Sequence, residues 1–133
     1  MADTVALLTF LGFHAETDSP TYEPTLASEI RRNLVAWIYN MDTVTASFAG
    51  RPPLLSSSYT STPFPLDLCD DELMDKDAMA EALRGLNADG WKVQPRLSQH
   101  TFTRSRAMLG LIREEIIRVG LGYGQTTALD TIL

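Results

Sequence analysis

Cysteine and histidine are scarce in this chain of 133 residues, which contains one cysteine and two histidines. Cys69 has no second cysteine with which to form an internal disulfide, so the sequence favours a reducing, intracellular location. A zinc site needs about four Cys, His or carboxylate ligands at suitable spacing, and Cys69, His14 and His100 form no such motif. We therefore expect no metal and no cofactor in this chain.

Basic residues are also few, since 11 Lys and Arg stand against 17 Asp and Glu and leave a net charge of −6. DNA-binding proteins neutralise phosphates with clustered Lys and Arg, so we expect no direct contact with nucleic acid. The longest apolar run, residues 5–13, is far shorter than the roughly 20 residues that span a bilayer. It also lacks the positively charged start of a signal peptide, and we expect no membrane association.

Sustained strand alternation is missing too, and apolar residues recur at the three- and four-residue spacing of helices. This spacing predicts helices over residues 3–13, 26–49 and 97–119, with further helical spacing over 74–86. Residues 51–65 contain four prolines and a Ser/Thr tract, which favour an extended internal loop. The predicted fold class is all-α: an irregular array of about four to five helices with one Pro/Ser-rich loop, within a single helical regulatory domain or fragment over 1–133.

The longest predicted helix, residues 26–49, has clear signals at both ends. Thr25, or Ser28 with Glu29, offers a polar side chain that suits a helix start. Gly50 can adopt the left-handed conformation that ends a helix, and the two prolines after Arg51 cannot continue its hydrogen bonding. The face predicted to lie in the core consists of Leu26, Ile30, Leu34, Ile38, Met41 and Phe48.

The first and last predicted helices are rich in apolar residues. In the first helix we expect Val5, Leu7, Leu8 and Leu11 to point inward, although Phe10 and Phe13 extend the apolar surface around the helix. A single neighbour cannot cover this whole surface, so the sequence predicts self-association. Gly120 is expected to end the last helix. That helix carries an apolar stripe made of Phe102, Met108, Leu111, Ile112, Ile116 and Val119.

Three groups of residues suggest chemistry, and each has a simpler structural explanation. The acidic cluster at 67–77 lacks the spacing of a calcium loop and is better explained as helix capping. Cys69 with His14 or His100 matches no local catalytic motif, and ordinary packing explains the same residues. The glycines at 120, 122 and 124 follow a helix rather than a strand, which favours a helix end over a phosphate loop.

Four charged residues lie on or near the long helix: Arg31, Arg32, Asp42 and Arg51. Buried charges are costly unless they are paired, so two interpretations compete. The residues either tie the helix to the loop through charge-assisted hydrogen bonds or contact an acidic ligand or partner. We favour the structural interpretation because Gly50 and the neighbouring prolines already have a structural role, which is to end the helix.

An ordered set of short motifs resembles a known family. The set begins with Leu11-Gly12-Phe13-His14 and continues through Glu29-Ile30-Arg31-Arg32, Tyr39, Asp42, Gly50-Arg51-Pro52-Pro53, Pro63, Pro65, Leu66, Asp67, Asn87-Ala88-Asp89-Gly90-Trp91 and Ile112-Arg113-Glu114-Glu115-Ile116. Its order and spacing resemble the later part of the fungus-specific transcription factor regulatory region. This region is also called the middle homology region of binuclear zinc-cluster transcription factors.

The resemblance implies a non-enzymatic region that regulates transcription in the nucleus through protein partners or the rest of its parent chain, sometimes with a small-molecule effector. It also implies that zinc and DNA binding belong to a separate module of the parent protein. Two alternatives stay open. A small-molecule sensor would have an apolar pocket lined by Trp37, Met41 and Phe48. An enzyme would need convergent polar residues with perturbed pKa values around Cys69 or His14.

Overall fold

The computed structural model describes residues 1–17, 19–94 and 96–122. They form five α-helices: α1 (Ala2–Phe10), α2 (Leu26–Ala49), α3 (Asp70–Met74), α4 (Lys76–Arg84) and α5 (Gln99–Leu121), with a short 3₁₀ helix at Ser57–Tyr59. Within these ranges the only extended pairing is an isolated bridge between Leu86 and Lys92. The predicted all-α fold class is confirmed. No helix in the described ranges is long and apolar enough to cross a membrane.

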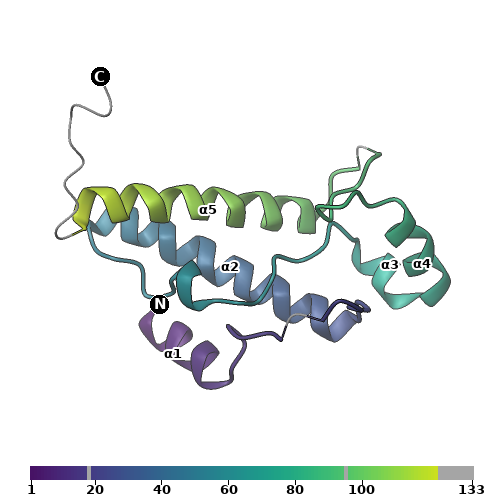
Figure 1. Ribbon diagram of the computed structural model, residues 1–133, viewed down its shortest axis with the longest axis horizontal. Helices are drawn as coiled ribbons and strands as arrows, with labels where there is room; N and C mark the ends of the chain where they lie inside the picture. The colour runs from purple at the N-terminus through teal and green to yellow at the C-terminus, as the bar shows by residue number, and fades with distance from the viewer. Residues whose placement is uncertain (18, 95, 123–133) are drawn as a thin grey trace.

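Helices α2 and α5 lie side by side and run in the same direction, as Figure 1 shows. Asn33 of α2 contacts His100 near the start of α5, and Thr43, ten residues later, lies beside Gly110. A parallel pair needs a long connection between the end of one helix and the start of the next. Residues 50–98 provide it, with the loop after Gly50 and helices α3 and α4.

Both ends of α2 form as the sequence predicts. The Thr25 hydroxyl accepts a hydrogen bond from the backbone N–H of Ser28, and the Ser28 hydroxyl accepts one from the backbone N–H of Thr25. This capping box satisfies two N–H groups that the helix leaves free. At the other end Gly50 has φ 61°, a left-handed conformation that side chains disfavour. The predicted helix end is therefore confirmed.

The faces of α2 are largely the reverse of those predicted. Ile30, Leu34 and Phe48, which we expected in the core, are 53%, 42% and 89% exposed, and among the predicted face only Ile38 is buried. The buried face instead includes charged and polar residues: Glu29, Arg32, Asn40, Asp42 and Thr43. The pattern of apolar residues failed here because the buried polar groups gain hydrogen-bond partners from the loop and from α5.

Helix α5 departs from its prediction in the same way. The predicted stripe is exposed along its length, with Ile112 and Ile116 at 58% and 66%, whereas Ala107 and Gly110 are buried against α2. A Cβ atom at Gly110 would lie 2.8 Å from Cε1 of Tyr39, so the glycine permits the close approach of the two helices. The helix also continues past Gly120 and is capped at Gly122. Gly124 lies outside the described residues.

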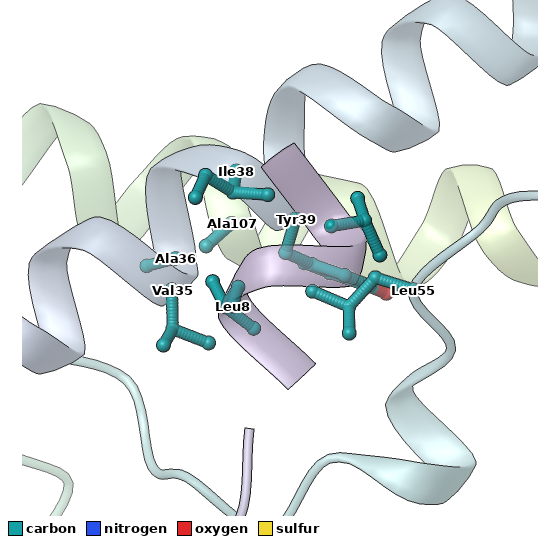
Figure 2. Packing of buried hydrophobic residues seen from close by; sticks show 8 residues of the cluster. Leu8, Val35, Ala36, Ile38, Tyr39, Leu55 and Ala107 are labelled. Atoms are coloured by element: carbon teal, nitrogen blue, oxygen red, sulfur yellow. The ribbon is translucent and has the colours of Figure 1, made fainter. Parts of the chain in front are cut away.

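The apolar core is small and lies where α1 meets α2, α5 and the loop (Figure 2). Val5 and Leu8 of α1 are buried as predicted, but Leu7 and Leu11 are 59% and 53% exposed, contrary to prediction. Helix α1 ends at Phe10 and not at residue 13, because a turn with Gly12 at φ 74° follows it. The exposed apolar surface expected on this helix is present.

The acidic segment forms two short helices. Asp75 separates them, because its extended backbone ends α3 and its carboxylate accepts hydrogen bonds from the first backbone N–H groups of α4. The Glu72 carboxylate accepts the backbone N–H of Cys69 at 2.7 Å at the start of α3. The carboxylates Glu72 and Asp75 therefore cap helices, as the sequence indicated.

Candidate functional site

Glu29, near the start of α2, is buried and holds the loop where it returns at residue 66. Its carboxylate accepts hydrogen bonds from the backbone N–H of Leu66 at 2.8 Å and from the Tyr22 hydroxyl at 2.7 Å. Burial raises the pKa of Tyr22, which therefore stays a neutral donor. The Arg32 guanidinium lies 3.7 Å from the same carboxylate. Partners of this kind make a buried carboxylate tolerable.

The two arginines of α2 form the next part of this network. Arg32 donates to both oxygens of Glu16, and its guanidinium lies 3.6 Å from the centre of the Tyr22 ring. Arg31 lies 3.8 Å from Glu16 and stacks 5.8 Å from the Phe13 ring. Both side chains thus fasten the segment between α1 and α2, and not the loop at 51–65 to which the structural interpretation tied them.

Asp42 fastens the start of the loop. It is fully buried, and its carboxylate accepts the backbone N–H of Leu55 at 2.8 Å. The Arg51 guanidinium lies 3.5 Å from the other oxygen and also donates to the carbonyl of Pro52. Pro52 is exposed and Pro53 is half-buried. The chain after Gly50 is therefore bound back onto α2.

Glu114 of α5 joins three elements at one carboxylate. It accepts hydrogen bonds from the Tyr39 hydroxyl at 2.6 Å, the Ser56 hydroxyl at 2.6 Å and the backbone N–H of Ser57 at 3.1 Å. Burial alone would raise the pKa of Glu114, but the hydrogen bonds from Ser56, Tyr39 and Ser57 lower it below its ordinary value. Burial raises the pKa of Tyr39, and its hydrogen bond to Glu114 raises it further.

Pro65 is buried, and its carbonyl accepts a hydrogen bond of 2.6 Å from Arg104 of α5. Arg104 is also buried, donates to the carbonyl of Asp89 and lies 4.8 Å from the centre of the Trp91 ring. Burial lowers the pKa of Arg104. Arg104 therefore joins the end of the loop to the turn at 87–91.

The sequence suggested roles for only some of the residues in this network, among them Arg32, Asp42 and Arg51. Four further members had no role assigned from the sequence: Glu16, Tyr22, Arg104 and Glu114. Glu114 lies 75 residues from Tyr39 in the chain, and Arg104 lies 39 residues from Pro65. Single polar residues on a helix give no signal for partners that far away, so the sequence could not identify the contacts of Arg104 and Glu114.

The pocket predicted at Trp37, Met41 and Phe48 does not form from these three residues. Trp37 lines a hollow of about 110 Å³ between α2 and α5, but the other lining residues are Asn40, Gln99, Phe102, Thr103 and Arg106. Phe48 is 89% exposed, and Met41 is not among the lining residues. The sensor alternative placed these side chains around an apolar pocket, whereas Trp37 and Phe48 lie on the surface of α2.

An apolar surface instead runs along α2 and α5, and we call it the outward face. Each of its residues lies three or four positions from another residue of its row, which places the row on one side of the helix. Trp37 and Phe102 meet at the 110 Å³ hollow, so the two rows adjoin. The row on α2 is Ile30, Leu34, Trp37, Met41, Val44 and Phe48. The row on α5 is Phe102, Arg106, Leu109, Ile112, Arg113 and Ile116.

Two of the residues considered for catalysis, Cys69 and His100, take part in ordinary side-chain contacts. The Cys69 sulfur lies 3.4 Å from the Lys92 ammonium, which also pairs with Glu72 at 2.8 Å. His100 bridges Asn33 and Asp70. The His14 backbone carbonyl accepts N–H groups from residues 61 and 62, and its side-chain Nδ1 is buried without a hydrogen-bond partner among the described residues. No group of three or more His, Cys, Asp or Glu side chains in the described part of the chain is placed to hold a metal.

A model of the fungal specific transcription factor domain family matches residues 3–109 of the chain. The match extends from α1 into the first half of α5 and therefore includes the Glu29, Asp42 and Arg104 contacts. The comparisons with curated proteins and with solved structures give no match.

Proposed function

The chain belongs to the family of fungal specific transcription factor domains, and we propose that it controls its parent transcription factor by binding other protein segments through the outward face. These segments belong to the rest of the parent chain or to a partner protein. The resemblance seen in the sequence and the family match agree on a regulatory region of a transcription factor. The family is not one of enzymes.

The observation that carries the proposal is the reversal of the faces of α2 and α5. Their large apolar side chains point away from the interface, with Trp37, Phe102 and Leu109 at 52%, 53% and 49% exposed. Contiguous apolar surface on a protein marks a place where another protein binds. The buried carboxylates Glu29 and Asp42 of α2 accept hydrogen bonds from the loop, so the loop side of α2 is already occupied.

The contacts of Arg31, Arg32 and Arg51 also support binding through the outward face, because these arginines already have partners within the chain. Each guanidinium lies within 4.0 Å of a carboxylate of the chain itself, at Glu16, Glu29 or Asp42. Such pairs explain the arginines without an acidic ligand. We therefore assign the family-motif residues to the scaffold that holds the loop and α2, and the outward face to binding.

We further propose a nuclear location and a separate module for zinc and DNA. The chain has a net charge of −6, and its 11 basic residues are outnumbered by 17 acidic ones. A surface of this charge is unsuited to the phosphate backbone, so DNA contact would come from another part of the parent protein.

A small-molecule sensor is the second candidate function. A cavity of about 310 Å³ lies between α2, α5 and the loop, and its size is suited to a small ligand. Apolar and hydroxyl-bearing side chains line it: Val35, Ala36, Tyr39, Ser57, Thr60, Ser61, Thr62, Pro63, Phe64 and Leu111. It does not include the three residues that the sequence suggested.

A reporter assay tests the first candidate. The chain is placed between an unrelated DNA-binding module and an activation segment, and transcription is compared with that of the same fusion without the chain. We expect the chain to change the output and the double substitution Trp37→Lys and Phe102→Lys to remove that effect. Tyr59→Lys is the matched control, because Tyr59 is 84% exposed but lies in the loop. Equal output from all fusions at equal protein levels would reject the proposal.

A further inference from the structure

We infer that the segment bound by the outward face is an amphipathic helix with carboxylates along one flank. The inference rests on the proposed function and specifies the chemistry of the partner. Two parallel apolar rows with a hollow between them form the kind of groove in which the apolar side of a helix lies.

The charges of the outward face point to an acidic partner. The row on α2 has no charged residue, and the row on α5 has only Arg106 and Arg113. The chain as a whole has more acidic than basic residues, whereas the charged residues of the outward face are all basic. The acidic residues of α5 lie elsewhere, because Glu114 binds the loop and Glu115 pairs with Arg118. Interfaces match opposite charges, and this face offers only positive ones.

Both arginines are placed to meet a partner. Arg106 is exposed, lines the hollow beside Trp37 and Phe102, and has no ion pair among the residues that the structure describes. Arg113 donates one N–H to the side-chain oxygen of Asn40 at 3.0 Å, which holds its guanidinium at the same α2–α5 boundary. A guanidinium has further donors for a carboxylate.

The dimensions of the outward face define the partner further. Ile30 and Phe48 are 18 residues apart on α2, about 27 Å along the helix axis, so a partner helix of about 18 residues covers the row. Arg106 and Arg113 are one heptad apart, about 10.5 Å along α5. Carboxylates one heptad apart on the partner would match them. The hollow of about 110 Å³, which Arg106 lines, would take one apolar side chain of the partner, as a knob enters a hole.

A second copy of this chain fits the face less well. Two copies that meet through the outward face would bring Arg106 and Arg113 of both copies to one interface that has no carboxylate in either row. Like charges at an interface oppose binding. An acidic helix removes this repulsion and covers the same apolar residues.

The test measures binding of fluorescent designed peptides to the whole chain by anisotropy. Three 18-residue amphipathic helices share a leucine stripe and differ only in their flanking residues, which are Glu, Gln or Lys. We expect the Glu peptide to bind most tightly and the Lys peptide least. The double variant Arg106→Glu and Arg113→Glu should weaken binding of the Glu peptide by about tenfold, because two attractive charge pairs become repulsive. The same variant should bind the Lys peptide more tightly than the unmodified chain does.

Control variants separate this inference from the proposed function. The double variant Arg84→Glu and Arg118→Glu makes the same change in net charge, but Arg84 lies on α4 and Arg118 pairs with Glu115 away from the outward face. It should keep the preference for the Glu peptide. Circular dichroism and melting must show every variant folded.

Several outcomes would overturn the inference. Equal binding of the three peptides, or binding to none of them, would show that the face does not select carboxylates. A dimer in light scattering that Trp37→Lys abolishes would assign the face to a second copy. In each case the reporter effect of Trp37→Lys and Phe102→Lys still decides the proposed function separately.

Discussion

The Tyr39 hydroxyl of α2 donates a hydrogen bond of 2.6 Å to the Glu114 carboxylate of α5, across 75 residues of sequence. The same carboxylate accepts the Ser56 hydroxyl and the Ser57 backbone N–H. One side chain thus fixes the spacing of the two long helices and the position of the loop beside them. Removal of the Glu114 carboxylate should therefore loosen contacts to α2 and to the loop at once.

We expect Glu114→Gln to lower the free energy of unfolding at pH 7 by about 2 kcal/mol, because hydrogen bonds to a charged group are stronger than neutral ones. The folded state lowers the pKa of Glu114, so its stabilisation is present above the pKa of the unfolded state. It is lost as the pH falls through the lower folded value. Urea unfolding from pH 7 to pH 3 should therefore show a smaller decline in the variant. Parallel curves would contradict this role.

Gly110→Ala should separate α2 from α5. Its Cβ would lie 2.8 Å from Cε1 of Tyr39 and 3.3 Å from Oγ1 of Thr43, and such overpacking costs about 1–3 kcal/mol. Gly120→Ala is the control, since Gly120 also lies in α5 but has nothing within 4 Å of its Cβ position. That change should stabilise the chain by up to about 1 kcal/mol. Thermal melts in which both variants shift in the same direction would argue against the close contact.

Gly50→Val should destabilise the chain by about 1–2 kcal/mol, because valine disfavours the observed φ of 61°. No atom lies within 4 Å of the Cβ position, so the cost comes from the backbone and not from a clash. Gly50→Asn is the control, since asparagine tolerates this conformation better. Denaturant titrations should rank the valine variant below the asparagine variant, and the reverse order would exclude a backbone cause.

Arg51→Ala should cost more stability than Arg84→Ala. Arg51 is 31% exposed and pairs with a fully buried Asp42, whose charge would lose a partner. Arg84 and Glu81 are 75% and 78% exposed, and such surface pairs contribute at most about 1 kcal/mol. Both variants remove one arginine, so net charge is matched. Equal midpoints in urea would remove the support for a structural role of Arg51.

Leu7→Lys or Phe10→Lys should reduce self-association of the isolated chain. These residues of α1 are 59% and 88% exposed, and exposed apolar patches promote association. Sedimentation velocity at micromolar concentrations measures the change, with Tyr59→Lys as a control on another exposed apolar residue. If the unmodified chain stays monomeric over this range, this surface does not drive association.

The ends of α2 could be predicted because they depend on neighbouring residues. Thr25 needs only the N–H of Ser28, and Gly50 needs only its own freedom at positive φ. The same holds for the carboxylate of Asp75, which caps the helix that begins at the next residue. The all-α class follows for a related reason, since the spacing of apolar residues selects a helix wherever its partner lies.

The direction in which each long helix faces was decided by tertiary structure. The apolar spacing of α2 and α5 marks a surface suited to burial but does not identify what covers it. Glu29 and Asp42 are buried because distant backbone N–H groups of Leu66 and Leu55 reach their carboxylates, and Gly110 is buried because Tyr39 lies against it. These contacts join segments far apart in the chain, and no local pattern of residues encodes them. The sequence therefore determined where α2 begins and ends, whereas the contacts between the helices determined which side of α2 and of α5 stayed open.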